Sequence, residues 1–188
     1  MGESVNRKTE GTKIDHPHHQ GPVFAYCPRC GAGLSARRLR DHEPERLYCE
    51  ECRFIFFQNP KVAACAIPRV DGKIVLLRRG IEPSYGKWVY PGGFADVGER
   101  MEDAARRETR EEVNLDVTIT GLVGVYSYPG YPVVIIVYKA EGNGDRPSVG
   151  DETLEVGLFG PDEIPWDELA FPSTVQALRD YFSRREDG

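Results

Sequence analysis

Three glutamates in one stretch of helical composition, residues 99–113, have a spacing that could hold a metal ion. On an α-helix each residue advances by about 100°, so Glu108, Glu111 and Glu112 fall within an arc of about 100°. That arc lies on or beside the apolar face around Met101. Like charges at these separations repel one another, and partial burial raises the cost unless cations neutralise them. Because Mg²⁺ binds carboxylate oxygens and shares its coordination sphere with substrate phosphates, the pattern predicts a magnesium platform.

Four of the five cysteines form two C-x-x-C pairs, which is the ligand pattern of a structural zinc site. Redox chemistry is the alternative use of such pairs, and the doubled pattern favours metal. We therefore expect Zn²⁺ bound by Cys27, Cys30, Cys49 and Cys52, in a closed site that has a structural role. The fifth cysteine, Cys65, lies in an apolar run and is expected to be a buried hydrophobic residue.

The elements that must position these side chains can be predicted from patterning. Two apolar runs, 62–67 and 73–77, flank an Asp-Gly pair and predict a hairpin. The stretch from Trp88 to Phe94 contains Pro-Gly-Gly and is expected to be a loop. The helix over 99–113 should end at Asn114, which accepts a left-handed backbone. Also predicted are strands at 117–126, 133–140 and 154–159, a polar loop at 142–150 and a helix at 173–185. Strands mixed with two helices predict an α/β (α+β) sandwich.

Composition divides the chain into three parts. Residues 1–23 are polar with few apolar anchors and predict a disordered tail, in which His16, His18 and His19 are more simply solvated than metal-bound. Residues 24–57 are rich in Cys, Arg and aromatic side chains and predict a zinc ribbon. Residues 58–185 are expected to form the larger domain, which contains the glutamate stretch.

The charge and hydropathy of the chain limit its partners. A net charge of −6 argues against a general surface for nucleic acid or anionic membranes. The ribbon arginines Arg37, Arg38 and Arg40 could contact nucleic acid, but neighbouring glutamates dilute that patch. No segment approaches the roughly 20 apolar residues that span a bilayer, and the N-terminus lacks the apolar region of a secretory signal. The expectation is a cytoplasmic protein, whose partners are not expected to include nucleic acid or membranes.

The glutamate stretch resembles the Nudix box, G-x5-E-x7-R-E-U-x-E-E-x-G-U, and the match runs from Gly93 to Leu115. Two positions differ from the box: Thr109 stands where the family has a bulky apolar residue, and Asn114 replaces a glycine. Neither difference removes a metal ligand, and Asn is the best substitute for glycine at a left-handed helix end.

The resemblance implies roles for individual residues. The catalytic divalent ions, Mg²⁺ or Mn²⁺, would be bound by Glu108, Glu111 and Glu112. The loop before the helix would be folded onto it by Glu99 and Arg107. The implied fold is the Nudix α/β/α sandwich with a mixed sheet, preceded here by a small zinc ribbon with four cysteine ligands.

The wider chain, over roughly residues 26–182, is similar to the zinc-ribbon branch of Nudix proteins, which includes enzymes acting on NADH, FAD and ADP-ribose. The NADH enzymes carry S-Q-P-W-P-F-P-x-S after the box, and this chain has only the fragment Phe171 to Ser173. The resemblance therefore implies Mg²⁺-dependent cleavage of ADP-ribose or FAD, with release of AMP. Two alternatives stay open: hydrolysis of nucleoside triphosphates, and a nucleotide-sensing regulator without catalysis.

Further candidate residues surround the box. A general base outside it could be Glu152 or Glu155. Arg78 and Arg79 could contact the substrate phosphates. Trp88 and Tyr126 could stack on a base or flavin. Gly92 and Gly93 would let the backbone approach the ligand closely. A solvated strand end for the arginines and a place in the core for the aromatic rings are the alternatives. Relatives are often homodimers, but no feature of the sequence requires one.

Overall fold

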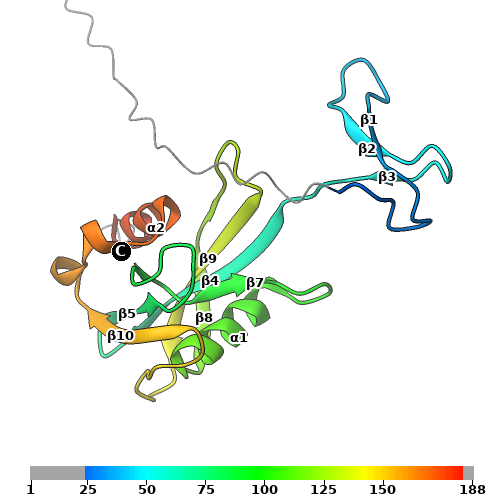
Figure 1. Ribbon diagram of the computed structural model, residues 1–188. Helices are drawn as coiled ribbons and strands as arrows, with labels where there is room; N and C mark the ends of the chain where they lie inside the picture. The colour runs from blue at the N-terminus through cyan, green and yellow to red at the C-terminus, as the bar shows by residue number, and fades with distance from the viewer. Residues whose placement is uncertain (1–23, 184–188) are drawn as a thin grey trace, which may run out of the picture. The chain divides into compact units, whose positions relative to one another are not determined.

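The computed structural model describes residues 24–183, which form two compact units with their boundary between Phe57 and Gln58 (Figure 1). The expected tail, residues 1–23, and its histidines His16, His18 and His19 lie outside the described residues. Residues 184–188, which include the predicted end of the last helix, lie outside them as well.

The smaller unit is a three-stranded antiparallel sheet in the order β1-β2-β3. Its strands are β1 (Ser35–Arg37), β2 (Arg46–Tyr48) and β3 (Ile55–Phe56). The sheet has little apolar core: the rings of Phe24 and Phe56 pack with their centroids 4.4 Å apart, while Tyr26 remains 72% exposed. A unit with this little buried apolar surface needs another source of stability, such as a bound metal ion.

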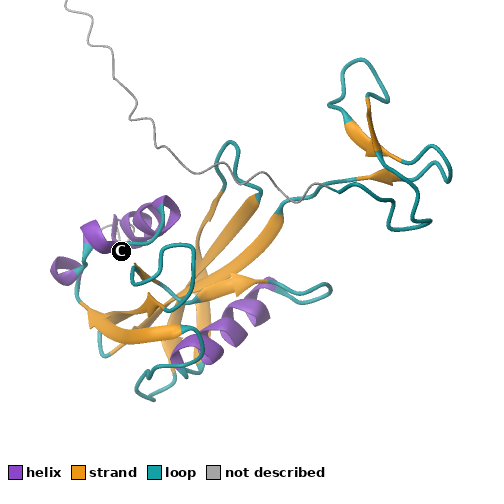
Figure 2. Ribbon diagram, in the orientation of Figure 1, coloured by secondary structure: helices purple, strands orange, loops and turns teal. Residues whose placement is uncertain are grey.

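The larger unit is built on a seven-stranded mixed sheet with the order β10-β5-β4-β9-β8, to which β6 and β7 add beside β5 and β4 (Figure 2). The strands β4 and β9 are parallel, and the other pairs are antiparallel. The helices α1 and α2 lie on opposite sides of this sheet (Figure 1). The mixed sheet with two helices confirms the predicted α/β/α sandwich.

The bounds of the elements in the larger unit are as follows. The strands are β4 (Lys61–Val70), β5 (Lys73–Arg79), β6 (Trp88–Val89), β7 (Gly92–Phe94), β8 (Val117–Tyr126), β9 (Val133–Gly142) and β10 (Thr153–Phe159). The helices are α1 (Met101–Val113), α2 (Pro172–Ser183) and two short 3₁₀ helices, η1 (Pro161–Glu163) and η2 (Trp166–Glu168).

The predicted hairpin is confirmed as β4 and β5. Asp71 and Gly72 in its turn have φ angles of 51° and 81°, the positive values that a two-residue turn between antiparallel strands requires. The strand predicted at 117–126 has the same bounds in the structure, and the last helix begins one residue before the predicted start. The strand predicted from 133 continues to Gly142 because it pairs there with Val117 of β8.

The prediction that Trp88 to Phe94 forms only a loop is wrong, because this stretch contains two short strands. Leu77 and Arg78 of β5 pair with β6, and residues 63–65 of β4 pair with β7. Only Tyr90 and Pro91 lie between the two strands. The glycines therefore do not exclude pairing here; they allow β7 to lie close against β4.

The helix α1 starts at Met101, two residues after its predicted start at Glu99. Its buried side chains Ala104, Ala105 and Val113 pack into the core, which the two helices form with the buried residues of β4 and β5. Within residues 24–183, no helix is both long and apolar enough to cross a membrane.

Candidate functional site: a carboxylate hollow beside α1

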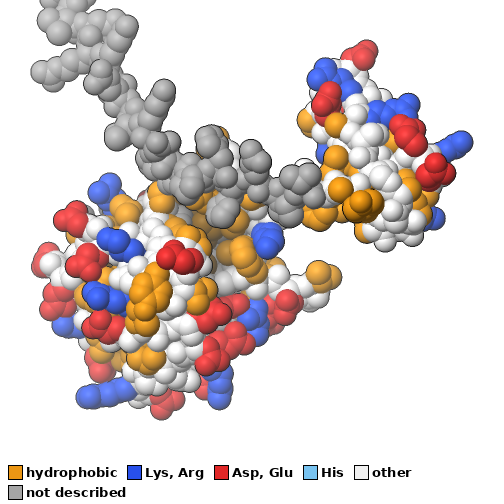
Figure 3. Space-filling view, viewed as in Figure 1, with side chains coloured by type: hydrophobic (Ala, Val, Ile, Leu, Met, Phe, Trp, Pro, Cys, Tyr) orange, Lys and Arg blue, Asp and Glu red, His pale blue; other side chains and the backbone are white. Residues whose placement is uncertain are grey.

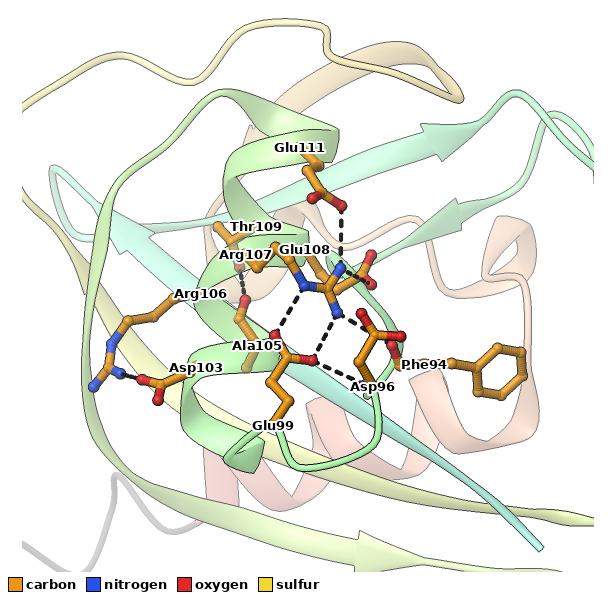
Figure 4. Close-up of polar contacts among 10 residues, drawn as sticks. All are labelled: Phe94, Asp96, Glu99, Asp103, Ala105, Arg106, Arg107, Glu108, Thr109 and Glu111. Carbon is orange, nitrogen blue, oxygen red and sulfur yellow. Dashed lines mark hydrogen bonds and ion pairs between the residues drawn. The ribbon is translucent and has the colours of Figure 1, made fainter.

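The turn before α1 is closed by Glu99. Its carboxylate accepts a hydrogen bond from the backbone N–H of Asp96 at 3.0 Å, and it also accepts from Nε of Arg107 at 2.9 Å (Figure 4). The hydrogen bond from Arg107, helped by that of Asp96, lowers the pKa of Glu99 from 4.5 to about 2. The side chain of Glu99 is thus held in the turn by these bonds, which explains why α1 begins only after Glu99.

The Arg107 guanidinium ties this turn to the acidic side of the helix. It donates to Glu108 at 2.7 Å and to Glu111 at 3.2 Å, and another nitrogen donates to the carbonyl oxygen of Phe94 at 3.2 Å (Figure 4). A planar guanidinium has five donors in a fixed geometry, so one side chain can hold strand, turn and helix together.

Five acidic residues line one hollow of about 310 Å³ beside the C-terminal half of α1, which we call the carboxylate hollow. Three come from the helix and two from the segment before β10: Glu108, Glu111, Glu112, Asp151 and Glu152. Acidic side chains gather over α1 on the face shown in Figure 3. The side chain of Glu108 is only 14% exposed, whereas that of Glu111 is 51% exposed. The three helix glutamates therefore do face one space, as their spacing predicts.

The Glu112 carboxylate is hydrogen-bonded to the backbone of β7. Its Oε2 accepts a hydrogen bond from the backbone N–H of Gly92 at 2.8 Å. The pKa of Glu112 is raised to about 7: burial is the main cause, the nearby charges of Glu108 and Glu152 add to the rise, and the Gly92 bond and Arg79 oppose it. Burial also raises the pKa of Glu108. Neighbouring acids with raised pKa values attract cations, because a positive charge would relieve both burial and mutual repulsion.

The two glycines of the Pro-Gly-Gly stretch are required by close approach. A Cβ atom on Gly93 would lie 2.5 Å from a carboxylate oxygen of Glu108, and one on Gly92 would lie 2.4 Å from the sulfur of Cys65. Any side chain at these positions would displace the carboxylates or β4. Cys65 is itself buried, and burial raises the pKa of its thiol, which fits the predicted role as a hydrophobic residue.

The four paired cysteines converge in the smaller unit. Their sulfur atoms all lie within 4.8 Å of one another, with Cys27 and Cys52 3.6 Å apart and Cys30 and Cys49 3.5 Å apart. A tetrahedral zinc ion with Zn–S bonds of about 2.3 Å needs sulfurs about 3.8 Å apart, so the set fits Zn²⁺. Gly31, at φ 77°, makes the turn of the first pair, and its N–H donates to the carbonyl oxygen of Cys27.

Comparison with known proteins assigns both units to a family. A family model of the NUDIX domain matches residues 59–181, and a second model, described as Nudix N-terminal, matches residues 25–58. The chain belongs to the Nudix hydrolase family. It is therefore an enzyme that acts on pyrophosphate bonds, and its smaller unit is the zinc ribbon of that family.

Individual relatives agree with this assignment. An ADP-ribose pyrophosphatase from Methanocaldococcus jannaschii is 33% identical over 133 residues, which cover 69% of this chain and 77% of that protein. An NAD-capped RNA hydrolase, NudC, from Vibrio vulnificus is 30% identical over 78% of this chain and 55% of its own length. The chain thus spans about half the length of that hydrolase. The crystal structure of a NUDIX hydrolase from Nitrosomonas europaea superimposes with a TM-score of 0.83 at 37% identity, covering 88% of this chain and 94% of that chain.

The structure accounts for both departures from the Nudix box. Thr109 is fully buried, and its hydroxyl donates to the carbonyl oxygen of Ala105 at 2.7 Å, so the polar atom is satisfied inside the Nudix helix (Figure 4). Asn114 adopts the left-handed conformation, with φ 50° and ψ 37°, and its side chain donates to the carbonyl oxygen of Val149 at 3.0 Å. The helix end predicted at Asn114 is confirmed.

The two arginines at the end of β5 have different surroundings. Arg78 lies over the Trp88 ring and pairs with Glu155 at 3.5 Å and Glu168 at 3.2 Å. Arg79 interacts electrostatically with Glu112 and Glu152 of the carboxylate hollow, and burial lowers the pKa of Arg79. Of these two arginines, only Arg79 is thus beside the hollow, and Arg78 is held by acids outside it.

The structure places the predicted stacking residues in the core. Trp88 and Tyr126 are each 5% exposed: Trp88 packs edge-on against Phe159, and the Tyr126 hydroxyl donates to Asp180 of α2 at 2.8 Å. This burial corrects the prediction that they stack on a substrate, because neither ring offers a free face in this arrangement. Both rings lie in the core, which was the alternative to a role in stacking on the substrate.

The two acids proposed as a base outside the box are separated by the fold. Glu155 lies on β10 with a side chain 57% exposed and paired with Arg78, and it does not line the carboxylate hollow. Glu152 does line it, as does Asp151, which the sequence did not single out. The sequence could have indicated Asp151, because it is adjacent to Glu152 and both residues lie in one turn before β10.

Proposed function

We propose that this Nudix enzyme hydrolyses a nucleoside diphosphate linked to a second group, with Mg²⁺ or Mn²⁺ as cofactor, and that ADP-ribose or FAD yields AMP. The observation that carries the proposal is the hollow lined by five carboxylates, with Arg79 beside it. Divalent cations bound there would balance the negative charge of the acidic residues and, together with Arg79, that of a diphosphate.

The residues of the hollow fit a hard divalent cation. All of its acidic side chains offer carboxylate oxygens, which Mg²⁺ prefers, and Glu112 is partly buried with a raised pKa that a cation would lower. We assign metal binding to Glu108, Glu111 and Glu112. Bound there, the metal would lower the pKa of a coordinated water and neutralise charge on the diphosphate.

Other residues would orient the ligands and the substrate. Glu99 and Arg107 would brace the helix glutamates, since Arg107 donates to Glu99, Glu108 and Glu111. Arg79 is positioned by stacking over the Phe171 ring, 5.1 Å from its centroid, and by a 2.8 Å hydrogen bond from Nε to the carbonyl oxygen of Pro83. We assign Arg79 to a substrate phosphate, since a guanidinium binds phosphate oxygens through its remaining donors.

For a base outside the box, we favour Glu152 over Glu155. Glu152 faces the same hollow as the helix glutamates, whereas Glu155 is paired with Arg78. A carboxylate at the rim could accept a proton from a water molecule near the diphosphate.

The similarity to an ADP-ribose pyrophosphatase supports the choice of substrate class. NAD-capped RNA, or NAD(H) itself, is the second candidate because several NAD-capped RNA hydrolases are similar to this chain. Those proteins are matched over about half of their length, and the segment typical of NADH enzymes is absent here.

The test is a substrate panel. Purified protein with Mg²⁺ is incubated with ADP-ribose, FAD, NADH, NAD-capped RNA and nucleoside triphosphates, and the products are separated by chromatography. We expect AMP from ADP-ribose or FAD, and loss of AMP in Glu112→Gln but not in Asp103→Asn, an exposed acid elsewhere on α1. Turnover of triphosphates alone would replace the proposed substrate class, and no turnover of any compound would favour a sensor.

A further inference from the structure

The segment from Ser148 to Thr153 caps the C-terminal end of α1. The last carbonyl oxygens of a helix have no partner within it and must be satisfied from outside. Here the segment's backbone amides and one hydroxyl supply the donors at 2.9 to 3.0 Å: Ser148 N to Val113 O, Gly150 N to Glu112 O, Asp151 N to Glu111 O, and Thr153 Oγ1 to Glu112 O. Two of the accepting carbonyls belong to glutamates whose side chains line the hollow.

Gly150 makes this close docking possible. A Cβ atom at this position would lie 2.1 Å from the carbonyl oxygen of Glu111 and 2.8 Å from that of Glu112. Both neighbours are backbone atoms of a packed helix and cannot rotate away as a flexible side chain would. Any other residue must therefore move the segment off the helix end.

Gly80 contacts the same segment from the end of β5. It follows Arg79 at the end of β5, and its N–H donates to the carbonyl oxygen of Glu152 at 2.7 Å. A Cβ atom on Gly80 would lie 2.8 Å from that oxygen. Glu152 itself has a φ of 58°, a left-handed conformation that a non-glycine residue adopts only when its surroundings hold it there.

From these contacts we infer that Gly80 and Gly150 are positioning residues, which fix Asp151 and Glu152 at the rim of the carboxylate hollow. The segment is anchored to the backbone of the glutamates it faces, so its acids and those of α1 keep one geometry. The inference rests on the proposed function for its effect on turnover, but the docking itself can be measured without turnover.

The kinetic test compares glycine variants of two kinds. Gly150→Ala and Gly80→Ala should lower kcat about tenfold or more at saturating Mg²⁺, because small displacements at a reacting centre are costly, with KM changed less than about threefold. Gly121→Ala is the matched control: like Gly80 and Gly150, Gly121 has no left-handed backbone, but a Cβ atom there would meet open space. It should keep kcat within about twofold of wild type.

A double-mutant cycle separates positioning from general damage. Glu152→Gln should lower kcat in the wild-type background and have less than about a twofold further effect in the Gly150→Ala background, because the displaced acid no longer contributes. Equal fold-losses in both backgrounds would overturn the inference, as would a Glu152→Gln variant with wild-type kcat.

Thr153→Val tests the docking with little change of volume, so it covers the case in which an alanine variant fails to fold. It removes the hydroxyl that donates to Glu112 O. Hydrogen exchange at the amides of Gly150 and Asp151 should be slow in the wild type and faster in Thr153→Val. Rapid exchange in the wild type would overturn the docking. A wild-type protein with slow exchange and no diphosphate turnover would instead retain the docking and refute the proposed function.

Discussion

Replacing Glu112 by Gln should stabilise the enzyme at alkaline pH when Mg²⁺ and Mn²⁺ are absent. Glu112 is mostly buried, receives a single hydrogen bond from Gly92 and faces the charges of Glu108 and Glu152. A glutamine oxygen can accept the same bond from Gly92 without carrying a charge. The substitution thus removes a repulsive, desolvated charge and keeps the local contact.

The size and the sign follow from the pKa of Glu112, which is about 7 in the folded protein and about 4.5 when unperturbed. Well below pH 4.5 the group is protonated in both the folded and the unfolded state, so it does not lower the free energy of unfolding. As pH rises from 4.5 to 7 the unfolded state gives up its proton first, so the free energy of unfolding falls. Above that range the full cost is about 3 kcal/mol, at 1.36 kcal/mol per pKa unit. We expect Glu112→Gln to be about 2 to 3 kcal/mol more stable than wild type at pH 8 and nearly equal to it at pH 4.5.

Urea unfolding followed by tryptophan fluorescence measures this difference. Both tryptophans of the chain, Trp88 and Trp166, lie in the Nudix unit, so the signal reports that unit and not the ribbon. Glu111→Gln is the matched control, because its carboxylate is half exposed, and it should change stability by less than about 1 kcal/mol. Adding Mg²⁺ should stabilise the wild type more than the Glu112→Gln variant. A Glu112→Gln protein that is less stable than wild type at pH 8 would refute the account of the buried charge.

Three further predictions concern the end of α1, the arginine proposed to bind the substrate phosphate, and the zinc ribbon. Asn114→Ala should destabilise the protein by about 2 kcal/mol in urea unfolding, since it adds left-handed strain and loses one hydrogen bond, while Asn114→Gly should change it by less than about 1 kcal/mol. Equal effects of the two variants would contradict this reasoning. Arg79→Gln should raise KM for the diphosphate about tenfold or more, and Arg78→Gln less than about threefold, in steady-state assays; the reverse order would exclude Arg79 as the phosphate contact. Cys49→Ser should lose zinc in metal analysis and lose the dispersed NMR signals of residues 24–57, while those of the Nudix unit persist. A dispersed ribbon spectrum without zinc would show that the metal is not needed for folding.

Local patterns predicted most of the elements and the centre of the site. The Asp-Gly turn, the left-handed Asn114 and the alternating apolar strands each act within a few residues, so the sequence displays them directly. The helix glutamates were found for the same reason, because the period of the helix alone brings them to one side.

The features that sequence analysis missed depend on contacts between distant segments. Residues 92–94 form a strand because β4, far earlier in the chain, pairs with them. The burial of Trp88 depends on β5 and β10, and no local pattern distinguishes it from a substrate-stacking ring. The docking of Gly150 on the helix end uses backbone atoms, which leave no trace in the sequence except the glycine itself.

The most direct test of the central claim is the Mg²⁺-dependent turnover of ADP-ribose by wild type, Glu112→Gln and Asp103→Asn under identical conditions. If the carboxylate hollow is the catalytic metal platform, the wild type and Asp103→Asn release AMP only with Mg²⁺ or Mn²⁺. The kcat of Glu112→Gln should then fall about 10²- to 10³-fold. Wild-type turnover that persists in Glu112→Gln would contradict the claim and place the chemistry elsewhere in the chain.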